Sequence, residues 1–256
     1  MQIAYQIQKT PPPDDGYDWR VFAKMSFYIL LPFFLIAIEP DLGSASVVLM
    51  LGFGVLFVIG VRWKIWVILF AAFLAMSTLL YEFGLRDYQK QRIDDFLAEK
   101  PSYHVQQSII AIGSGGLTGK DKDDATQVQL KFLPIATTDF IFAYHVERFG
   151  FLGALVLIFT YMALTVHLLG LRNKFHNDHF GIVFSSGLAI LIFIYSAINI
   201  AMTIGFAPVV GIPLPMYSYG GTSFMNFMIL FGILENLLAF RFDFLYNSVS
   251  FLKRKR

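Results

Sequence analysis

The chain has 256 residues, of which 56% are apolar and 28 are phenylalanine, and its mean hydropathy is +0.61. This is more apolar surface than a soluble domain of this length can bury, so the composition predicts an integral membrane protein. The net charge of +2 argues against a nucleic-acid partner, and the lack of cysteine excludes disulfides and cysteine-ligated metals.

Six apolar runs are each long enough to cross a bilayer as a helix. Before them, 1–20 is a polar cytoplasmic lead-in with three consecutive prolines, and after them 242–256 is a basic cytoplasmic tail. The predicted fold is therefore an all-α, polytopic transmembrane bundle over 21–241. Its spans are predicted at 21–38, 44–61, 65–81, 138–171, 181–205 and 225–240.

The segment 82–138, between the third and fourth spans, is too polar to cross a bilayer and too long for a simple turn. Orientation follows from the lysine and arginine residues of the short loops. They occur before the first span, in the turns at 62–64 and 172–180, and after the last span, whereas the EPDLG turn and the 206–224 loop have none. Both termini are therefore predicted to be cytoplasmic, with EPDLG, 82–138 and 206–224 on the outer face.

Two acidic residues lie at and inside the start of the fourth span. If the helix begins at Thr138, Glu147 lies about 12 Å deeper than Asp139 and about 80° round the helix axis. An ionisable side chain inside a membrane span is costly and usually faces a polar cavity, which makes both carboxylates functional-site candidates. Thr138 and Asp139 are also N-cap residue types, so a plain helix cap is the competing interpretation of Asp139.

A glycine-rich stretch in the long loop, GSGGLTGKD at 113–121, has some features of a phosphate loop. The spacing of a nucleotide-binding loop fails at its first glycine and at its final serine or threonine. Gly115 and Gly116 still allow backbone N–H groups to form an anion-binding concavity, to which Lys120 adds charge. A flexible surface turn without any ligand is the competing interpretation.

The loop before the sixth span, GIPLPMYSYGG, combines two prolines with a pair of glycines. These residues favour a rigid re-entrant turn, which is tolerated at membrane depth only when it is buried in protein or lines a cavity. Ser218 and Tyr219 are therefore expected to face the same groove as Asp139. The five histidines are scattered over both predicted faces, so the sequence predicts no histidine metal site.

Several motifs together resemble the SEDS family of membrane proteins. They are YHVQQSIIAIGSGGLTGK, TQVQLKFLP and TTDFIFAYHVERFGFLG, together with EPDLG and GIPLPMYSYGGTSF, and they follow the family's order over about 20–240. Within the family the chain is most similar to the members that elongate the wall of rod-shaped bacteria. The resemblance implies an inverting peptidoglycan glycosyltransferase of the bacterial cytoplasmic membrane, whose substrate is lipid II, an undecaprenyl-pyrophosphate-linked disaccharide pentapeptide.

By this resemblance, Asp139 falls on the family's catalytic acid, and Glu147 falls on the first of two adjacent family acids. The second of these acids is Arg148 here, and a family Glu and His near the catalytic acid are replaced by Ile135 and Thr137. The family has more spans than the six predicted here. The chain is therefore expected to be a member that lacks the opening spans, which leaves an inactive fragment as one interpretation.

The resemblance implies that Asp139 accepts a proton from the acceptor sugar while undecaprenyl pyrophosphate leaves, with Glu147 in a separate supporting role. Lys120 or a divalent cation would stabilise the leaving pyrophosphate, and no other cofactor is expected. The implied partner is a class B penicillin-binding protein, in elongation or in division. A flippase for a lipid-linked precursor and a non-catalytic scaffold stay open as alternatives, although acids gathered at the outer side favour the enzyme.

Overall fold

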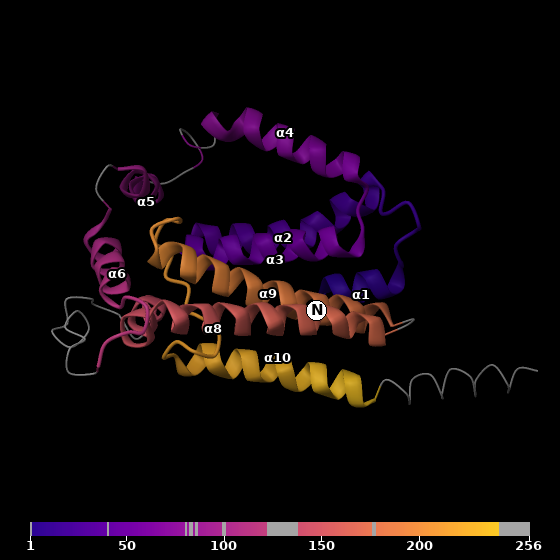
Figure 1. The fold of residues 1–256 in the computed structure, drawn as a ribbon. Coiled ribbons are helices and arrows are strands. Elements are labelled where there is room, and N and C mark those ends of the chain that lie inside the picture. Colours follow the sequence, from indigo (N-terminus) through magenta and orange to yellow (C-terminus); the bar gives the residue numbers. More distant parts are fainter. Residues whose placement is uncertain are drawn as a thin grey trace, which may run out of the picture.

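The computed structural model describes residues 2–39, 41–79, 81, 84, 87–98, 101–121, 138–175 and 178–240. Over these residues the long regular elements are all helices, and an isolated bridge joins Tyr17 to Val61. The prediction of an all-α fold is confirmed. Figure 1 shows the helices α1 (Gln2–Lys9), α2 (Trp19–Ile38), α3 (Leu42–Ile59), α4 (Trp63–Leu79), α5 (Asp87–Leu97), α6 (Tyr103–Ser114), α8 (Ile141–Leu171), α9 (His179–Thr203) and α10 (Gly221–Ala239).

The membrane spans correspond to the predicted apolar runs. Five described helices, α2, α3, α8, α9 and α10, are long and apolar enough to cross a membrane. α4 has 17 residues, about 26 Å of helix, which is near the minimum for a bilayer core of about 30 Å. The chain is therefore an integral membrane protein, and α4 is the shortest of its six apolar helices.

α9 is the central helix of the bundle. Half of its membrane-spanning stretch is buried inside the protein, and it packs against α8, α3 and α1. One apolar cluster fills the space between α9 and the first helices, and a second lies between α9, α8 and α10. Figure 1 shows α9 between α3 and α8. The buried polar side chains of α9 can therefore reach neighbouring segments.

The first residues form a helix that the sequence interpretation of a polar lead-in did not include. α1 buries Ala4 and Ile7 against α9, and the side-chain oxygen of Gln8 accepts a hydrogen bond of 2.8 Å from the backbone N–H of Phe180. An eight-residue helix is too short to be stable alone, so its tertiary contacts with α9 stabilise it. The apolar residues of α1 alternate with polar residues and lie close to three consecutive prolines, so the sequence did not suggest a helix there.

Segments that lie far apart in the sequence meet at one end of the bundle, near α5 and α6 (Figure 1). At the turn between α2 and α3, the side chain of Asp41 accepts a hydrogen bond of 2.9 Å from the N–H of Ser44. Hydrogen bonds with the Ser44 side chain and then with its backbone hold the pKa of Asp41 below its usual range. A Cβ atom on Gly43 would lie 2.6 Å from the carbonyl oxygen of Val210, so glycine allows the start of α3 to touch the 206–220 segment. The EPDLG turn and the GIPLP loop therefore share one end, as predicted.

Candidate functional site

Asp139 lies in a turn, Thr138 to Phe140, directly before α8. The helix begins at Ile141 rather than at Thr138, so the predicted helical offset of about 12 Å between Asp139 and Glu147 does not apply. The residue at the N-cap position is Phe140, and no side chain caps the helix. The competing interpretation of Asp139 as a plain cap therefore finds no support in the geometry.

The carboxyl group of Asp139 is half-buried at the end of the bundle. Burial raises the pKa of Asp139 above its usual range, and a hydrogen bond with the Thr138 side chain opposes this rise. A Cβ atom built on Gly211 would lie 3.6 Å from Asp139 Oδ2, so the carboxylate lies beside the backbone of Gly211. A carboxylate whose pKa is raised towards neutrality is a better general base than an ordinary aspartate.

Asn199, on α9, binds the backbone on both sides of this carboxylate. Its Nδ2 donates hydrogen bonds of 2.8 Å to the carbonyl oxygen of Asp139 and 2.7 Å to the carbonyl oxygen of Ile212. The side chain is fully buried. The sequence interpretation did not single out Asn199, because nothing in an apolar span marks one amide as the partner of a residue 60 positions away.

The 206–220 segment has irregular backbone, and its residues Ile212, Leu214 and Pro215 are buried in the protein. The hydroxyl of Ser218 accepts a hydrogen bond of 2.8 Å from the N–H of Leu214 and donates one of 2.6 Å to the carbonyl of Thr138. The hydroxyl of Tyr161, on α8, donates to the carbonyl of Pro215 at 2.6 Å. Irregular backbone at membrane depth requires such internal partners. The structure thus joins Ser218 to the turn that carries Asp139.

We expect a cysteine pair, Thr138→Cys with Ser218→Cys, to form a disulfide under mild oxidation, because Ser218 Oγ lies 2.6 Å from the Thr138 carbonyl. The chain has no cysteine of its own, so a gel shift after thiol labelling measures only the introduced pair. The matched control combines Thr138→Cys with Tyr219→Cys, at a side chain that is 81% exposed. Equal crosslinking of both pairs would contradict this arrangement.

Tyr219 forms no hydrogen bond or ion pair with Asp139 among the described residues, and its side chain is 81% exposed. That Tyr219 faces the same groove as Asp139 stays a prediction. Its neighbour Tyr217 instead binds His145 of α8, with 2.6 Å between the hydroxyl and Nδ1. The other ring nitrogen of His145, Nε2, lies 3.0 Å from the carbonyl of Gly153, which can only accept. Nε2 therefore carries a hydrogen, and in the neutral ring Nδ1 accepts from the Tyr217 hydroxyl. This pair joins residues 72 positions apart, which sequence patterns could not reveal.

The glycine-rich stretch packs against a break in α8. Gly150 has φ of 68° and ψ of −168°, so α8 consists of a short first part and a long second part at an angle to it (Figure 1). The N–H groups of Phe151 and Leu152, which the break frees, donate to the carbonyls of Gly116 and Leu117 at 2.9 and 3.1 Å. The loop therefore supplies the hydrogen-bond partners that the helix lost.

The packing of the glycine-rich stretch on α8 also explains its glycines, and it brings the stretch next to the backbone of Glu147. The N–H of Lys120 donates to the carbonyl of Glu147 at 3.0 Å, and a Cβ atom on Gly115 would lie 2.2 Å from the carbonyl oxygen of Val146. Close backbone approach thus accounts for Gly115 without a ligand. Gly116, with φ of 56°, adopts the left-handed conformation that glycine favours. Anion binding by Gly115, Gly116 and Lys120 stays a prediction.

Glu147 is fully buried in the first part of α8, six residues after its start, or about 9 Å along the axis. It is therefore separated from Asp139, which lies outside the helix and half-exposed. The two carboxyl groups occupy different surroundings, as the hypothesis of separate roles requires. Lys120 lies beside the Glu147 backbone, and no contact joins it to Asp139 among the described residues.

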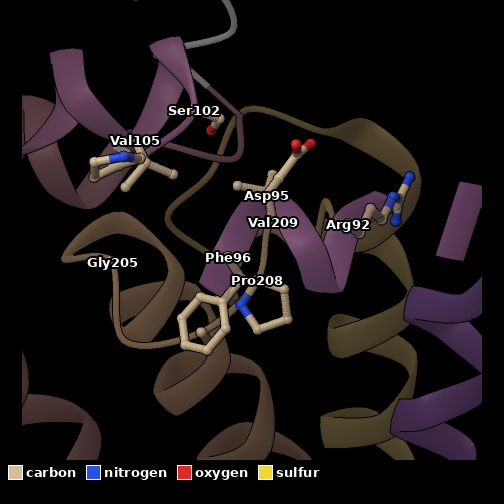
Figure 2. Close-up of a pocket in the computed structure, with 10 residues that line it drawn as sticks. Arg92, Asp95, Phe96, Ser102, Val105, Gly205, Pro208 and Val209 are labelled. Carbon is tan, nitrogen blue, oxygen red and sulfur yellow. The ribbon is translucent and has the colours of Figure 1, made fainter. Parts of the chain in front are cut away.

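Figure 2 shows a hollow at this end, between α5, α6 and the start of the 206–220 segment. Arg92, Asp95 and Phe96 line one side, and Pro208 and Val209 line the other. Its volume of about 90 Å³ is below the roughly 150 Å³ of a cavity that holds benzene, so a sugar does not fit it as it stands.

No group of three His, Asp or Glu side chains in the described part of the chain could hold a metal ion.

Comparison with known proteins places the fold and the motifs in context. A family model described as cell cycle protein, and named for FtsW, RodA and SpoVE, matches residues 1–242. The peptidoglycan glycosyltransferase MrdB of Helicobacter pylori is 60% identical over 246 residues, which are 96% of this chain and 64% of that protein. MrdB of Escherichia coli K12 is 41% identical over 83% of this chain and 59% of its own length. The chain thus spans less than two thirds of the length of these curated relatives.

Two solved structures have a similar arrangement of helices. A chain from a peptidoglycan synthase complex is 26% identical, with a TM-score of 0.76 over 93% of this chain and 68% of that chain. A mutant of the rod shape determining protein RodA from Thermus thermophilus is 23% identical, with a TM-score of 0.62 over 93% of this chain and 63% of its own. At this identity the second likeness concerns the fold alone.

Proposed function

We propose a function from one premise: the chain belongs to the FtsW, RodA and SpoVE family of cell cycle proteins. The predicted membership of the SEDS family is thereby confirmed. Relatives that are 60% and 41% identical are named peptidoglycan glycosyltransferase. We infer that this chain forms part of a peptidoglycan glycosyltransferase that polymerises lipid II during cell-wall elongation.

Asp139 is the general base in this proposal. Its carboxylate takes the proton of the acceptor sugar's 4-hydroxyl as that oxygen attacks C1 of the donor sugar. The bond from C1 to undecaprenyl pyrophosphate breaks with the electron pair leaving on the pyrophosphate, and the single displacement inverts C1. The next acceptor sugar can react after Asp139 has released its proton to solvent.

The observation that carries the proposal is the setting of Asp139. It is a half-buried carboxylate with a raised pKa, outside α8, on a turn held by Asn199 and Ser218. Such a group is fixed in place and able to accept a proton near neutral pH. The flippase alternative would place its working acids through the depth of the bundle. Among the described residues Glu147 is the one fully buried acid, and it lies near the same end as Asp139.

The proposal extends to the membrane side and to the partner. The site end of the bundle would face the outside of the bacterial cytoplasmic membrane, with both termini cytoplasmic, because the basic short loops lie at the opposite end. A class B penicillin-binding protein would bind the chain and crosslink the product. The similar chain in a peptidoglycan synthase complex supports this partnership. Co-purification after mild detergent extraction tests it.

The divalent cation of the sequence hypothesis would enter with the pyrophosphate of the substrate. The described residues do not fit a cation held by the protein alone, because no three His, Asp or Glu side chains gather. Lys120 stays a candidate for contact with the pyrophosphate.

Polymerisation of labelled lipid II by the purified protein in liposomes tests the function. We expect glycan chains from the wild type and none from Asp139→Ala. Transfer of lipid II across the membrane without polymer would favour the flippase, and neither activity at normal protein abundance would favour a scaffold or an inactive fragment.

A further inference from the structure

Asn199 is one of the few polar side chains that the described bundle buries completely. It uses both hydrogens of its amide, at 2.8 Å to the carbonyl of Asp139 and 2.7 Å to the carbonyl of Ile212. Its Oδ1 has no hydrogen-bond partner within the described residues. The opposite orientation of the amide would place Oδ1 against two carbonyl oxygens, so the donor orientation is the favourable one. Asn199 therefore acts in this site as a double donor.

The two carbonyls belong to the two backbone segments that meet at the Asp139 carboxylate. One carbonyl is that of Asp139 itself, and holding it fixes the peptide plane that follows the residue. The other belongs to Ile212, next to Gly211, against which the carboxylate lies. Both belong to backbone without helical hydrogen bonding, so the amide replaces partners that regular structure would supply.

The amide reaches both carbonyls from the most buried of the described membrane-spanning helices. Asn199 lies on α9, four residues before the end of this central helix. Ile212 lies only 13 positions after Asn199, in the segment that follows α9, whereas Asp139 lies 60 positions before it. The Asn199 side chain thus ties the Asp139 turn to the backbone at Ile212, beside the Gly211 backbone near the carboxylate.

We propose that Asn199 is a positioning residue for Asp139, which holds the carboxylate in place by donating to the carbonyls of Asp139 and Ile212 together. This proposal rests on the proposed function, in which Asp139 is the base. Asn199 touches no reacting atom in it. A shift of the base by about 1 Å is enough to lower turnover by about 10²-fold, whereas substrate binding elsewhere is unaffected.

The first test compares Asn199→Leu with Ser196→Ala. Leucine keeps the size of the side chain but donates nothing, and Ser196 is a buried α9 residue whose hydroxyl donates within its own helix, at 2.8 Å to the Ile192 carbonyl. In lipid II polymerisation we expect Asn199→Leu to lower kcat by about 10²-fold with KM within about twofold of the wild type. Ser196→Ala is expected to change neither constant. An unchanged kcat in Asn199→Leu would overturn the proposal.

A second measurement separates positioning from loss of the fold and needs no catalysis. The chain lacks cysteine, so Asp139→Cys introduces a single thiol at the site. We expect a water-soluble methanethiosulfonate reagent to label this thiol about tenfold faster when Asn199→Leu is added, because the turn is released from α9. Ser196→Ala should leave the labelling rate unchanged, and a thiol beyond the site, in Gly113→Cys, should react equally in all backgrounds.

The two arms distinguish the two proposals. If the wild type makes no polymer, the proposed function fails, and the labelling rates still decide whether Asn199 holds position 139. If polymerisation occurs but Asn199→Leu changes neither kcat nor the labelling rate, positioning by Asn199 is wrong and the function stands. If the Gly113→Cys thiol also reacts faster with Asn199→Leu, the substitution has loosened the whole bundle, which likewise contradicts a local positioning role.

Discussion

Asp139→Asn is expected to lower the rate of lipid II polymerisation by about 10²- to 10⁴-fold, the usual contribution of a general base. Asparagine keeps the size of the side chain and its ability to accept the Thr138 hydrogen bond, but it cannot take a proton. Because Asp139 does not cap α8, protein abundance and melting temperature should stay at wild-type values. The measurement is initial rate together with Tm in detergent. Polymerisation near the wild-type rate would show that Asp139 is not the base.

The rate of the wild type also depends on pH through the same group. Asp139 acts as base only when deprotonated, so the rate falls as pH falls through its pKa. Burial raises this pKa, so the acidic limb of the rate profile should lie above the value of about 3.9 of an ordinary aspartate. The fall of the rate at acidic pH should be absent from the residual activity of Asp139→Asn.

Gly119→Ala is expected to destabilise the protein by about 3 kcal/mol or more, through a clash that no side-chain rotation relieves. Its Cβ atom would lie 2.1 Å from the carbonyl oxygen of Arg148 and 2.4 Å from the carbonyl carbon, and its φ of 86° is unfavourable for alanine. The loop would have to move away from the helix break at Gly150. The backbone N–H groups of α8 that follow the break would then lose their hydrogen-bond partners. The expected result is a sharp loss of abundance and of Tm in detergent.

Two other glycines provide matched controls for this prediction. Gly113, inside α6, has open space around it, so Gly113→Ala should leave Tm unchanged or raise it slightly, since alanine favours helix. Gly116 also has open space but a φ of 56°, so Gly116→Ala should cost only about 1 kcal/mol of backbone strain. If Gly119→Ala proved as stable as Gly113→Ala, the packing of this loop on α8 would be wrong.

The glycine-rich stretch shows where local sequence reasoning ends. The pattern GSGGLTGK allowed either an anion-binding loop or a surface turn, because both need glycine for its backbone freedom. The structure adds close approach to another helix, which depends on the break at Gly150, about 30 residues further along the chain. Gly150 itself lies in an apolar run where a single glycine gives no sign of a break. Contacts of this kind are not encoded in either segment alone.

The sequence by itself determined the features that depend on local composition and on the spacing of apolar residues. The apolar runs predicted the membrane-spanning helices, their order and the membrane, because each run must bury its apolar surface in protein or in lipid. The motifs predicted the family and drew attention to Asp139, Glu147 and Ser218. The basic loops predicted which ends of the spans belong together, and the structure brings EPDLG and the GIPLP loop to one end.

The tertiary structure alone decided how Asp139 is held and what surrounds it. The turn before α8, the amide of Asn199, the hydroxyl of Ser218 and the pair of His145 with Tyr217 all depend on partners between 13 and 80 positions away. Their physical reason is shared. Backbone without helical partners at the edge of a membrane bundle must find donors and acceptors in other segments, and only packing determines which side chains come within reach.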